Sequence, residues 1–240
     1  MKRITGYDVL LFCFLWYGWM MTFPTVLCLL LNNADDLRAA AEVQETVTEH
    51  PLVQLVEHHR NNPAVLLTAF LTAVIIAPLA EEFIFRFLLQ GYAVRRFGIA
   101  GIAAVSFVFA ALHGTERHAY NDTFFLMITG VCIVNITVFL FGLFYFAFIR
   151  RFPIQEHIIR FNWTWCGTLQ CIGLFAAAVP LIFTLTFFLR SMYPESVSDP
   201  VPLFVFSLLL GWVYYRTQQL VPCFLMHAAL NALSFALILL

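Results

Sequence analysis

The sequence has few charged residues for its length. Lysine, arginine, aspartate and glutamate make up 11% of 240 residues, less than half the share of about 25% in ordinary soluble domains. The 13 basic and 14 acidic residues leave a net charge of −1, which gives no basic patch for nucleic acid. Hydrophobic residues reach 62% and aromatic residues 17%. The composition excludes an ordinary soluble domain and predicts a membrane protein with no nucleic-acid partner.

Other familiar patterns are missing as well. The sequence contains no internal repeat and no low-complexity tract. Its cysteines have neither metal-ligand spacing nor the pattern of small secreted domains, and all lie in or beside apolar runs: Cys13, Cys28, Cys132, Cys166, Cys171 and Cys223. We interpret them as small hydrophobic core residues.

Long apolar segments dominate what is present. A helix of about 20 residues crosses the hydrocarbon core of a bilayer. Seven segments approach that length: 8–31, 63–94, 99–113, 123–149, 165–189, 201–215 and 220–240. The first is too long for a signal peptide and carries Trp16, Tyr17 and Trp19, so we interpret it as a retained anchor. The predicted fold class is all-α, a polytopic transmembrane helical bundle of about seven spans.

The distribution of basic residues predicts the orientation. With a cytoplasmic N-terminus, eight lysines and arginines fall on the inside and four on the outside. This distribution favours an N-terminus inside and a C-terminus outside.

Residues 32–62 form the one sizeable hydrophilic stretch. Leu37, Ala41 and Val43 have helical spacing, Pro51 interrupts it, and a second apolar face follows. We expect a pair of short helices on the membrane surface after the first span. Three histidines near Glu57 could bind a metal, but solvated side chains are the preferred interpretation for His50, His58 and His59.

Three charges interrupt the second apolar segment, in the stretch PLAEEFIFRFLL. One charge at the centre of a membrane helix costs about 2.5–3.5 kcal/mol on insertion scales, so these side chains must face protein or water. On an α-helix, Glu82 and Arg86 lie four residues apart on one face and can form an ion pair. Glu81 points about 100° away from Glu82 and is left available as a base. Alternatively, all three snorkel to water at the end of the span.

Two more apolar segments carry polar side chains. His113 lies at the end of an apolar run in the stretch SFVFAALHG, one turn after Phe109. His227 and Asn231 lie one turn apart in PCFLMHAALNALS. A lone histidine in an apolar helix is more often a satisfied hydrogen-bonding core residue than a catalyst. Two histidines with an amide and a free carboxylate favour a functional site, because ionisable groups inside membranes are usually functional.

These residues resemble the motifs of a known family. Glu81 to Arg86 match EExxxR, Phe109 to His113 match FxxxH, and His227 to Asn231 match HxxxN. The motifs and their order are similar to those of the CPBP intramembrane proteases, which include CAAX prenyl endopeptidases and bacteriocin-processing or immunity proteins formerly called Abi. The resemblance covers roughly residues 63–240, so we divide the chain into an anchor and acidic loop, 1–62, and a protease-like domain, 63–240.

The resemblance implies an endopeptidase site. Glu81 would activate water, His113 would assist that water or bind a metal, and His227 with Asn231 would stabilise the oxyanion. Glu82 and Arg86 would be a structural ion pair. Zinc held by Glu81, His113 and His227 is the alternative. The family is described both as metalloproteases and as glutamate-dependent enzymes, and the sequence has no HExxH motif that would decide between them. Because zinc would occupy the obvious base, no cofactor is favoured.

The expected substrate is a prenylated CAAX-type tail or another membrane-associated peptide, and the expected location is a bacterial cytoplasmic membrane. A non-catalytic immunity or binding scaffold and a proton-linked transporter are the rival functions. The sequence does not determine the oligomeric state.

Overall fold

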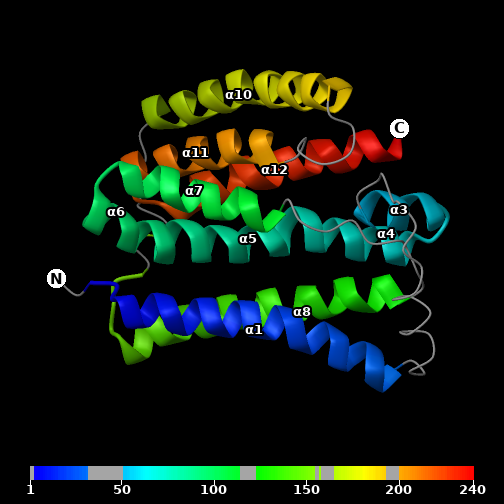
Figure 1. The fold of residues 1–240 in the computed structure, drawn as a ribbon, viewed down its shortest axis with the longest axis horizontal. Helices are drawn as coiled ribbons and strands as arrows, with labels where there is room; N and C mark the ends of the chain where they lie inside the picture. The colour runs from blue at the N-terminus through cyan, green and yellow to red at the C-terminus, as the bar shows by residue number, and fades with distance from the viewer. Residues whose placement is uncertain (1–2, 32–50, 114–122, 155–156, 158–164, 193–199) are drawn as a thin grey trace. The chain divides into compact units, whose positions relative to one another are not determined.

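The computed structural model describes residues 3–31, 51–113, 123–154, 157, 165–192 and 200–240. Within these ranges the chain is helical apart from turns and short connections, and they contain no strand, so the all-α fold class is confirmed (Figure 1). The helices, with η marking π-helical segments, are α1 Gly6–Leu31, α3 Pro51–His58, α4 Pro63–Phe70, η1 Leu71–Ile76, α5 Ala77–Glu81, η2 Glu82–Gln90, α6 Gly91–Phe97, α7 Ala100–His113, α8 Thr123–Phe144, η3 Tyr145–Ile149, α10 Trp165–Met192, α11 Pro200–Thr217 and α12 Leu220–Leu239.

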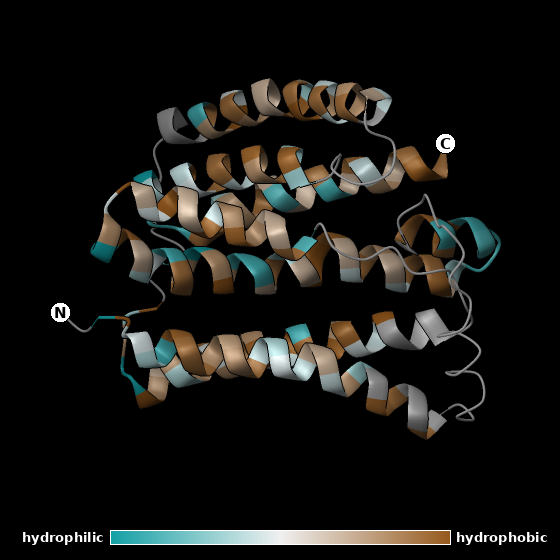
Figure 2. Ribbon diagram, in the orientation of Figure 1, coloured by the Kyte–Doolittle hydropathy of each residue, from teal (hydrophilic) through white to brown (hydrophobic). Residues whose placement is uncertain are grey.

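Each of the seven predicted segments is a helix or a run of consecutive helices. Figure 2 shows that hydrophobic residues predominate along most of them. Among the described residues, four helices are long and apolar enough to cross a membrane: Pro63–Phe97, Ile128–Ile149, Leu169–Leu189 and Leu220–Leu239. Helix α7 is apolar but shorter. The protein is therefore an integral membrane protein, whereas the count of seven spans and the orientation stay predictions.

The hydrophilic stretch after the first helix is described only in part. Residues 32–50, with the first predicted surface helix and His50, lie outside the described residues. The second predicted helix is α3, which begins at Pro51. Its Leu55 and Val56 are fully buried, as its apolar face predicted, while Glu57 and His58 are exposed. Its location on a membrane surface stays a prediction.

The described helices belong to two compact units. The first comprises Met1–Val9, Glu81–Glu116 and Leu143–Leu230, and the second comprises Leu10–Ala80, Arg117–Gly142 and Asn231–Leu240. Both units combine parts of the two domains assigned from the sequence, and that assignment stays a prediction.

In the first unit, α7 packs against α11, η2 and α6, and α10 packs against α11. Glu81, His113 and His227 all lie in this unit. Of the four candidate membrane spans among the described residues, the one in α10 is the least enclosed, because only 6% of Leu169–Leu189 is buried, against 33% of each of the others. Large side chains such as Leu169, Phe187 and Phe188 are exposed, as expected for a helix that faces lipid.

The second unit is held by polar and aromatic contacts between its own helices. The indole Nε1 of Trp16 donates to Asn135 Oδ1 at 2.9 Å, which satisfies a buried amide on an apolar helix. Phe70 and Phe235 pack edge to face with ring centroids 5.5 Å apart. These contacts give the second unit specific packing in addition to apolar burial.

Two glycines shape the turn between α6 and α7 in the first unit. Gly98 has φ of 59°, a left-handed conformation that glycine adopts without strain, and its N–H donates to Val94 O at 2.8 Å. Gly101 lies against the preceding helix, since a Cβ there would be 2.6 Å from the backbone carbon of Ala93. The close approach of α6 and α7 therefore requires glycine at position 101.

We expect Gly101→Ala to destabilise the protein. The added methyl group meets backbone, which cannot move aside as a flexible side chain can, and overpacking of this kind typically costs about 1–3 kcal/mol. Gly173→Ala is the matched control, because a Cβ at Gly173 meets nothing within 4 Å. Thermal unfolding of the detergent-purified proteins should show a lower midpoint for Gly101→Ala and an unchanged or higher one for Gly173→Ala. Equal midpoints for the two variants would contradict the close packing of α6 and α7.

Candidate active site

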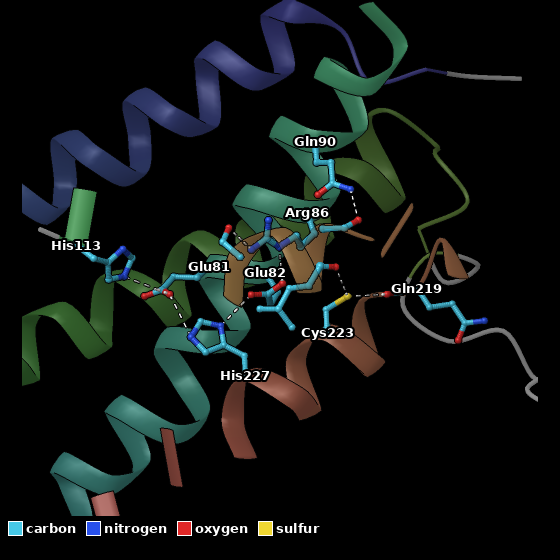
Figure 3. A network of polar contacts seen from close by, with 11 residues as sticks. Glu81, Glu82, Arg86, Gln90, His113, Gln219, Cys223 and His227 are labelled. Atoms are coloured by element: carbon cyan, nitrogen blue, oxygen red, sulfur yellow. Dashed lines mark hydrogen bonds and ion pairs between the residues drawn. The ribbon is translucent and has the colours of Figure 1, made fainter. Parts of the chain in front are cut away.

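A ladder of three buried polar side chains runs along the π-helical segment η2. Glu82, Arg86 and Gln90 are exposed by 1% or less. Arg86 Nε donates to Glu82 Oε2 at 3.0 Å, and Arg86 Nη2 donates to Ser207 Oγ on α11 at 2.9 Å. Gln90 Nε2 donates to the carbonyl of Gly211 at 2.7 Å (Figure 3). The ladder therefore links η2 to α11.

The guanidinium of Arg86 also contacts an aromatic ring. Its central carbon lies 5.6 Å from the ring centroid of Phe109 on α7. Such a cation–π contact stabilises a charge that has been removed from water. The alternative drawn from the sequence was that Glu82 and Arg86 extend to water at the end of the span. It is wrong for both side chains, because they are buried and paired with each other.

Glu82 has a second partner that spacing did not predict. His227 Nδ1 on α12 lies 2.9 Å from Glu82 Oε1, so the carboxylate binds Arg86 with one oxygen and His227 with the other. A carboxylate accepts, so His227 Nδ1 is the protonated nitrogen. Glu82 thereby fixes the orientation of the His227 ring as well as neutralising Arg86.

Glu81 faces the same histidine from its other side. Glu81 Oε2 lies 3.8 Å from His227 Nε2 and 3.7 Å from His113 Nε2 (Figure 3). The expectation that Glu81 and Glu82 diverge by about 100° assumed α-helical winding. A π-helix bonds residue i to residue i+5, so each residue turns by less than in an α-helix. Glu81 ends α5 at the junction with η2, and both carboxylates reach one imidazole.

His113 is oriented by its own helix. Its Nδ1 lies 2.7 Å from the carbonyl oxygen of Phe109, which can only accept, so Nδ1 carries the proton. In the neutral form of each histidine, Nε2 is then the unprotonated nitrogen. His113 and His227 thus both turn Nε2 toward a single oxygen of Glu81.

Phe109 explains the aromatic position of the FxxxH motif. Its ring centroid lies 4.3 Å from that of His113 and 6.0 Å from that of His227. Phe85 packs edge to face on the same ring at 5.0 Å. One phenylalanine therefore packs against both imidazoles and against the Arg86 guanidinium.

Exposure divides the polar groups into two sets. The side chains of His113 and Glu81 are 32% and 14% exposed, whereas those of His227 and Glu82 are 6% and 1% exposed. Substrate and water can therefore reach Glu81 and His113. Glu82, Arg86 and His227 are buried inside the protein.

Asn231 follows His227 by one turn of α12, as its spacing predicted. It belongs to the second compact unit, where its Nδ2 donates to the carbonyl of Ala73 in η1 at 2.8 Å. The side-chain amide has two N–H donors, and this contact uses one of them. A catalytic role for Asn231 stays a prediction.

Glu81, His113 and His227, the alternative zinc ligands, are residue types that bind zinc, but their arrangement in the structure is not that of a metal site. Ligating histidines commonly donate their second nitrogen to a carboxylate or a carbonyl, as His113 and His227 do. However, in the part of the chain that the structure describes, no group of three or more His, Cys, Asp and Glu side chains could hold a metal ion. We therefore derive no catalytic step through a metal.

The match to a known family agrees with this geometry. Residues 63–233 match the family described as type II CAAX prenyl endopeptidase Rce1-like. The chain belongs to this family. The resemblance to CPBP proteases found in the three motifs is thereby confirmed, and the Rce1-like family is a protease family. Searches of curated proteins and of solved structures gave no match.

The sequence of this Rce1-like protein does not predict the partners of the ladder. Ser207 and Gly211 lie 121 residues from Arg86 and Gln90, and no local spacing connects them. Gln90 had a detectable signal, since it continues the four-residue interval of Glu82 and Arg86. Gly211 allows the approach, because a Cβ there would be 2.9 Å from Gln90 Oε1 and 2.6 Å from Ile102 Cγ2.

Replacing Arg86 should strongly destabilise this Rce1-like protein. Arg86→Met leaves Glu82 ionised and buried without its cation, and breaking a buried ion pair costs about 3–5 kcal/mol. Arg216→Met is the control, because Arg216 is exposed and stacks on Trp212 at 6.0 Å. Thermal unfolding and the yield of monodisperse protein in detergent measure the difference. Similar losses for both variants would mean that the Arg86 ladder does not support the fold.

Proposed function

We propose that this protein is an intramembrane endopeptidase that hydrolyses a peptide bond near the C-terminus of a prenylated, CAAX-type or other membrane-associated substrate. Glu81 is the general base, His113 assists the water, and His227 with Asn231 stabilises the oxyanion. The description of the family that the chain matches supports this substrate class. The proposed location is a bacterial cytoplasmic membrane.

The convergence of two histidines on one carboxylate oxygen carries the proposal. The separations of 3.7 and 3.8 Å between Glu81 Oε2 and the two Nε2 atoms are too long for hydrogen bonds. A water molecule bound to Glu81 can lie beside either nitrogen and within reach of both groups. Because the Nδ1 atoms are engaged elsewhere, the ring nitrogens that face this water are defined.

The hydrolysis requires one proton to move twice. Glu81 removes a proton from water as the water oxygen attacks the peptide carbonyl carbon. The protonated Glu81 then gives that proton to the departing amide nitrogen as the carbon–nitrogen bond breaks. His113 accepts a hydrogen bond from the water at Nε2 and holds it for attack. The immediate products are a carboxylic acid and an amine, the acid then loses its proton to water or to the amine, and Glu81 is again a carboxylate.

The tetrahedral intermediate needs donors for its negative oxygen. Removing one such donor commonly costs a factor of about 10²–10³ in rate. His227 supplies an Nε2 proton when it is doubly protonated, with Nδ1 held on Glu82. Asn231 supplies the N–H that Ala73 does not take. Glu82 is in this scheme a positioning residue, because it acts through His227.

The rival functions use the same residues without hydrolysis. A binding scaffold or a proton-linked transporter needs a buried carboxylate and histidines, but it does not need one accessible base aligned with two imidazoles. The accessible Glu81 beside the enclosed Glu82 favours catalysis, since only Glu81 is open to a substrate.

Glu81→Gln should abolish peptidase activity without unfolding the protein. The amide keeps the size of the side chain but cannot act as a base, and loss of a general base costs a factor of about 10²–10⁴. Glu57→Gln removes an exposed carboxylate and is the control. Cleavage of quenched lipidated peptides by the purified proteins measures the effect, and thermal unfolding checks the fold. Full peptidase activity in Glu81→Gln would overturn the assignment of Glu81 as the base. If cells that carry an inactive variant keep their immunity, the non-catalytic immunity scaffold would be favoured instead.

Activity should survive complete removal of metal. The proposed mechanism uses Glu81 as the base, a role that it could not fill while ligating zinc. Elemental analysis of active protein before and after chelator treatment, with peptide cleavage measured on the same samples, tests this expectation. One zinc per chain that leaves together with the activity would establish Glu81, His113 and His227 as metal ligands instead.

A further inference from the structure

A proline lies inside the long helical run that carries Glu81, three residues before it. The run extends from Pro63 to Phe97. Within it, Pro78 is a buried residue of α5 and comes directly after the π-helical segment η1 and Ala77. Proline has no backbone N–H, so it removes one hydrogen bond from the helix. In membrane helices a proline is tolerated where local π-helical winding and neighbouring helices satisfy the freed backbone groups.

The carbonyl group of Ala73 loses its helical donors at this point. The residues that could donate to it are Ala77, four places later in α-helical winding, and Pro78, five places later in π-helical winding. The N–H of Ala77 donates to the carbonyl of Thr72 instead. Pro78 has no N–H to give. An unpaired carbonyl in a membrane helix is costly, so Ala73 requires a donor from another helix.

Asn231 on α12 supplies that donor. Its Nδ2 donates to the carbonyl oxygen of Ala73 at 2.8 Å. Ala73, Pro78 and Asn231 all belong to the second compact unit. The contact also defines which way the amide is turned, because a flipped side chain would bring two oxygens together. Since the amide group is planar, holding one N–H on Ala73 also sets the direction of the second.

We propose that Pro78 is a positioning residue for Asn231. The inference rests on the proposed function, in which the second N–H of Asn231 stabilises the oxyanion. Pro78 acts through Ala73, because it withholds the backbone donor that would otherwise compete with the Asn231 amide. A donor that is already oriented needs no rearrangement as the negative charge develops, which is why its orientation affects the rate.

Any residue with an N–H at position 78 would remove this device. In α-helical winding the Ala73 carbonyl would then accept from residue 77, and in π-helical winding it would accept from residue 78. Either way the helix satisfies its own carbonyl. The Asn231 amide would lose its anchor and rotate about its side-chain bonds.

A double-mutant cycle in thermal unfolding tests the link between Pro78 and Asn231 without any assay of activity. It uses the full-length protein in detergent. Asn231→Ala leaves the Ala73 carbonyl without a donor, so the unfolding midpoint should fall by about 2 °C or more. In the Pro78→Ala background the carbonyl has a backbone donor, and the same replacement of Asn231 should cause less than half of that fall. Equal falls in the two backgrounds would overturn the proposal.

Peptide cleavage tests the positioning role. Pro78→Ala should lower kcat about ten-fold and leave KM unchanged, because an oxyanion donor acts on the transition state rather than on bound substrate. Asn231→Ala removes the amide altogether and should lower kcat by a factor of about 10²–10³. Pro180→Ala is the matched control, since Pro180 is an exposed proline inside α10, and it should change neither constant.

Other results would also overturn the proposal. Unchanged kcat in Pro78→Ala would mean that Asn231 works without its anchor. Equal losses of kcat in Pro78→Ala and Pro180→Ala would indicate a general effect of replacing prolines. If Pro78→Ala does not fold, an unchanged midpoint in Asn231→Ala alone would show that the Ala73 carbonyl does not depend on the amide. A native protein that cleaves no peptide would contradict the proposed function itself, whereas the thermal cycle would still show whether Pro78 controls the contact.

Discussion

The buried charge of Arg86 is the constraint on which the first unit depends. A guanidinium cannot give up its proton inside a protein, so its charge must be balanced where it lies. Glu82 balances it, and Ser207 and Phe109 contact the guanidinium from two other helices. Because Glu82 must stay ionised to do so, its second oxygen is a firm acceptor for His227. The position of the His227 imidazole on α12 thus depends on the charge of Arg86, which lies in η2 one turn after Glu82.

The two neighbouring glutamates illustrate how burial separates identical side chains into different roles. Glu82 is enclosed and saturated by Arg86 and His227, so no substrate can use it. Glu81, one residue earlier, is 14% exposed, and its nearest basic groups are the imidazoles of His113 and His227 at 3.7 and 3.8 Å. The π-helical winding of η2 lets both face His227, which regular α-helical winding would have opposed.

The sequence predicted the helices well because long apolar runs bounded by charge have few other structures available in a membrane. It also predicted the Glu82–Arg86 contact, which depends on spacing within one helix. The contacts of Glu82 with His227 and of Arg86 with Ser207 could not be predicted, since they depend on how distant helices pack. The π-helical segments were missed for a related reason: no residue type marks them, and tertiary packing selects them. The roles of His113 and Asn231 in catalysis rest on family resemblance and chemistry.

The small buried fraction of α10 has a consequence for how the unit behaves outside a bilayer. Only 6% of its span is enclosed by protein, so hydrocarbon chains rather than neighbouring helices supply most of its surroundings. Its attachment through α11 is accordingly sensitive to the solvent that replaces lipid, while the contacts of α7 with η2 and α11 are internal to the protein. A short-chain detergent would loosen α10 first, while Glu81, Glu82, His113 and His227 would keep their positions relative to one another.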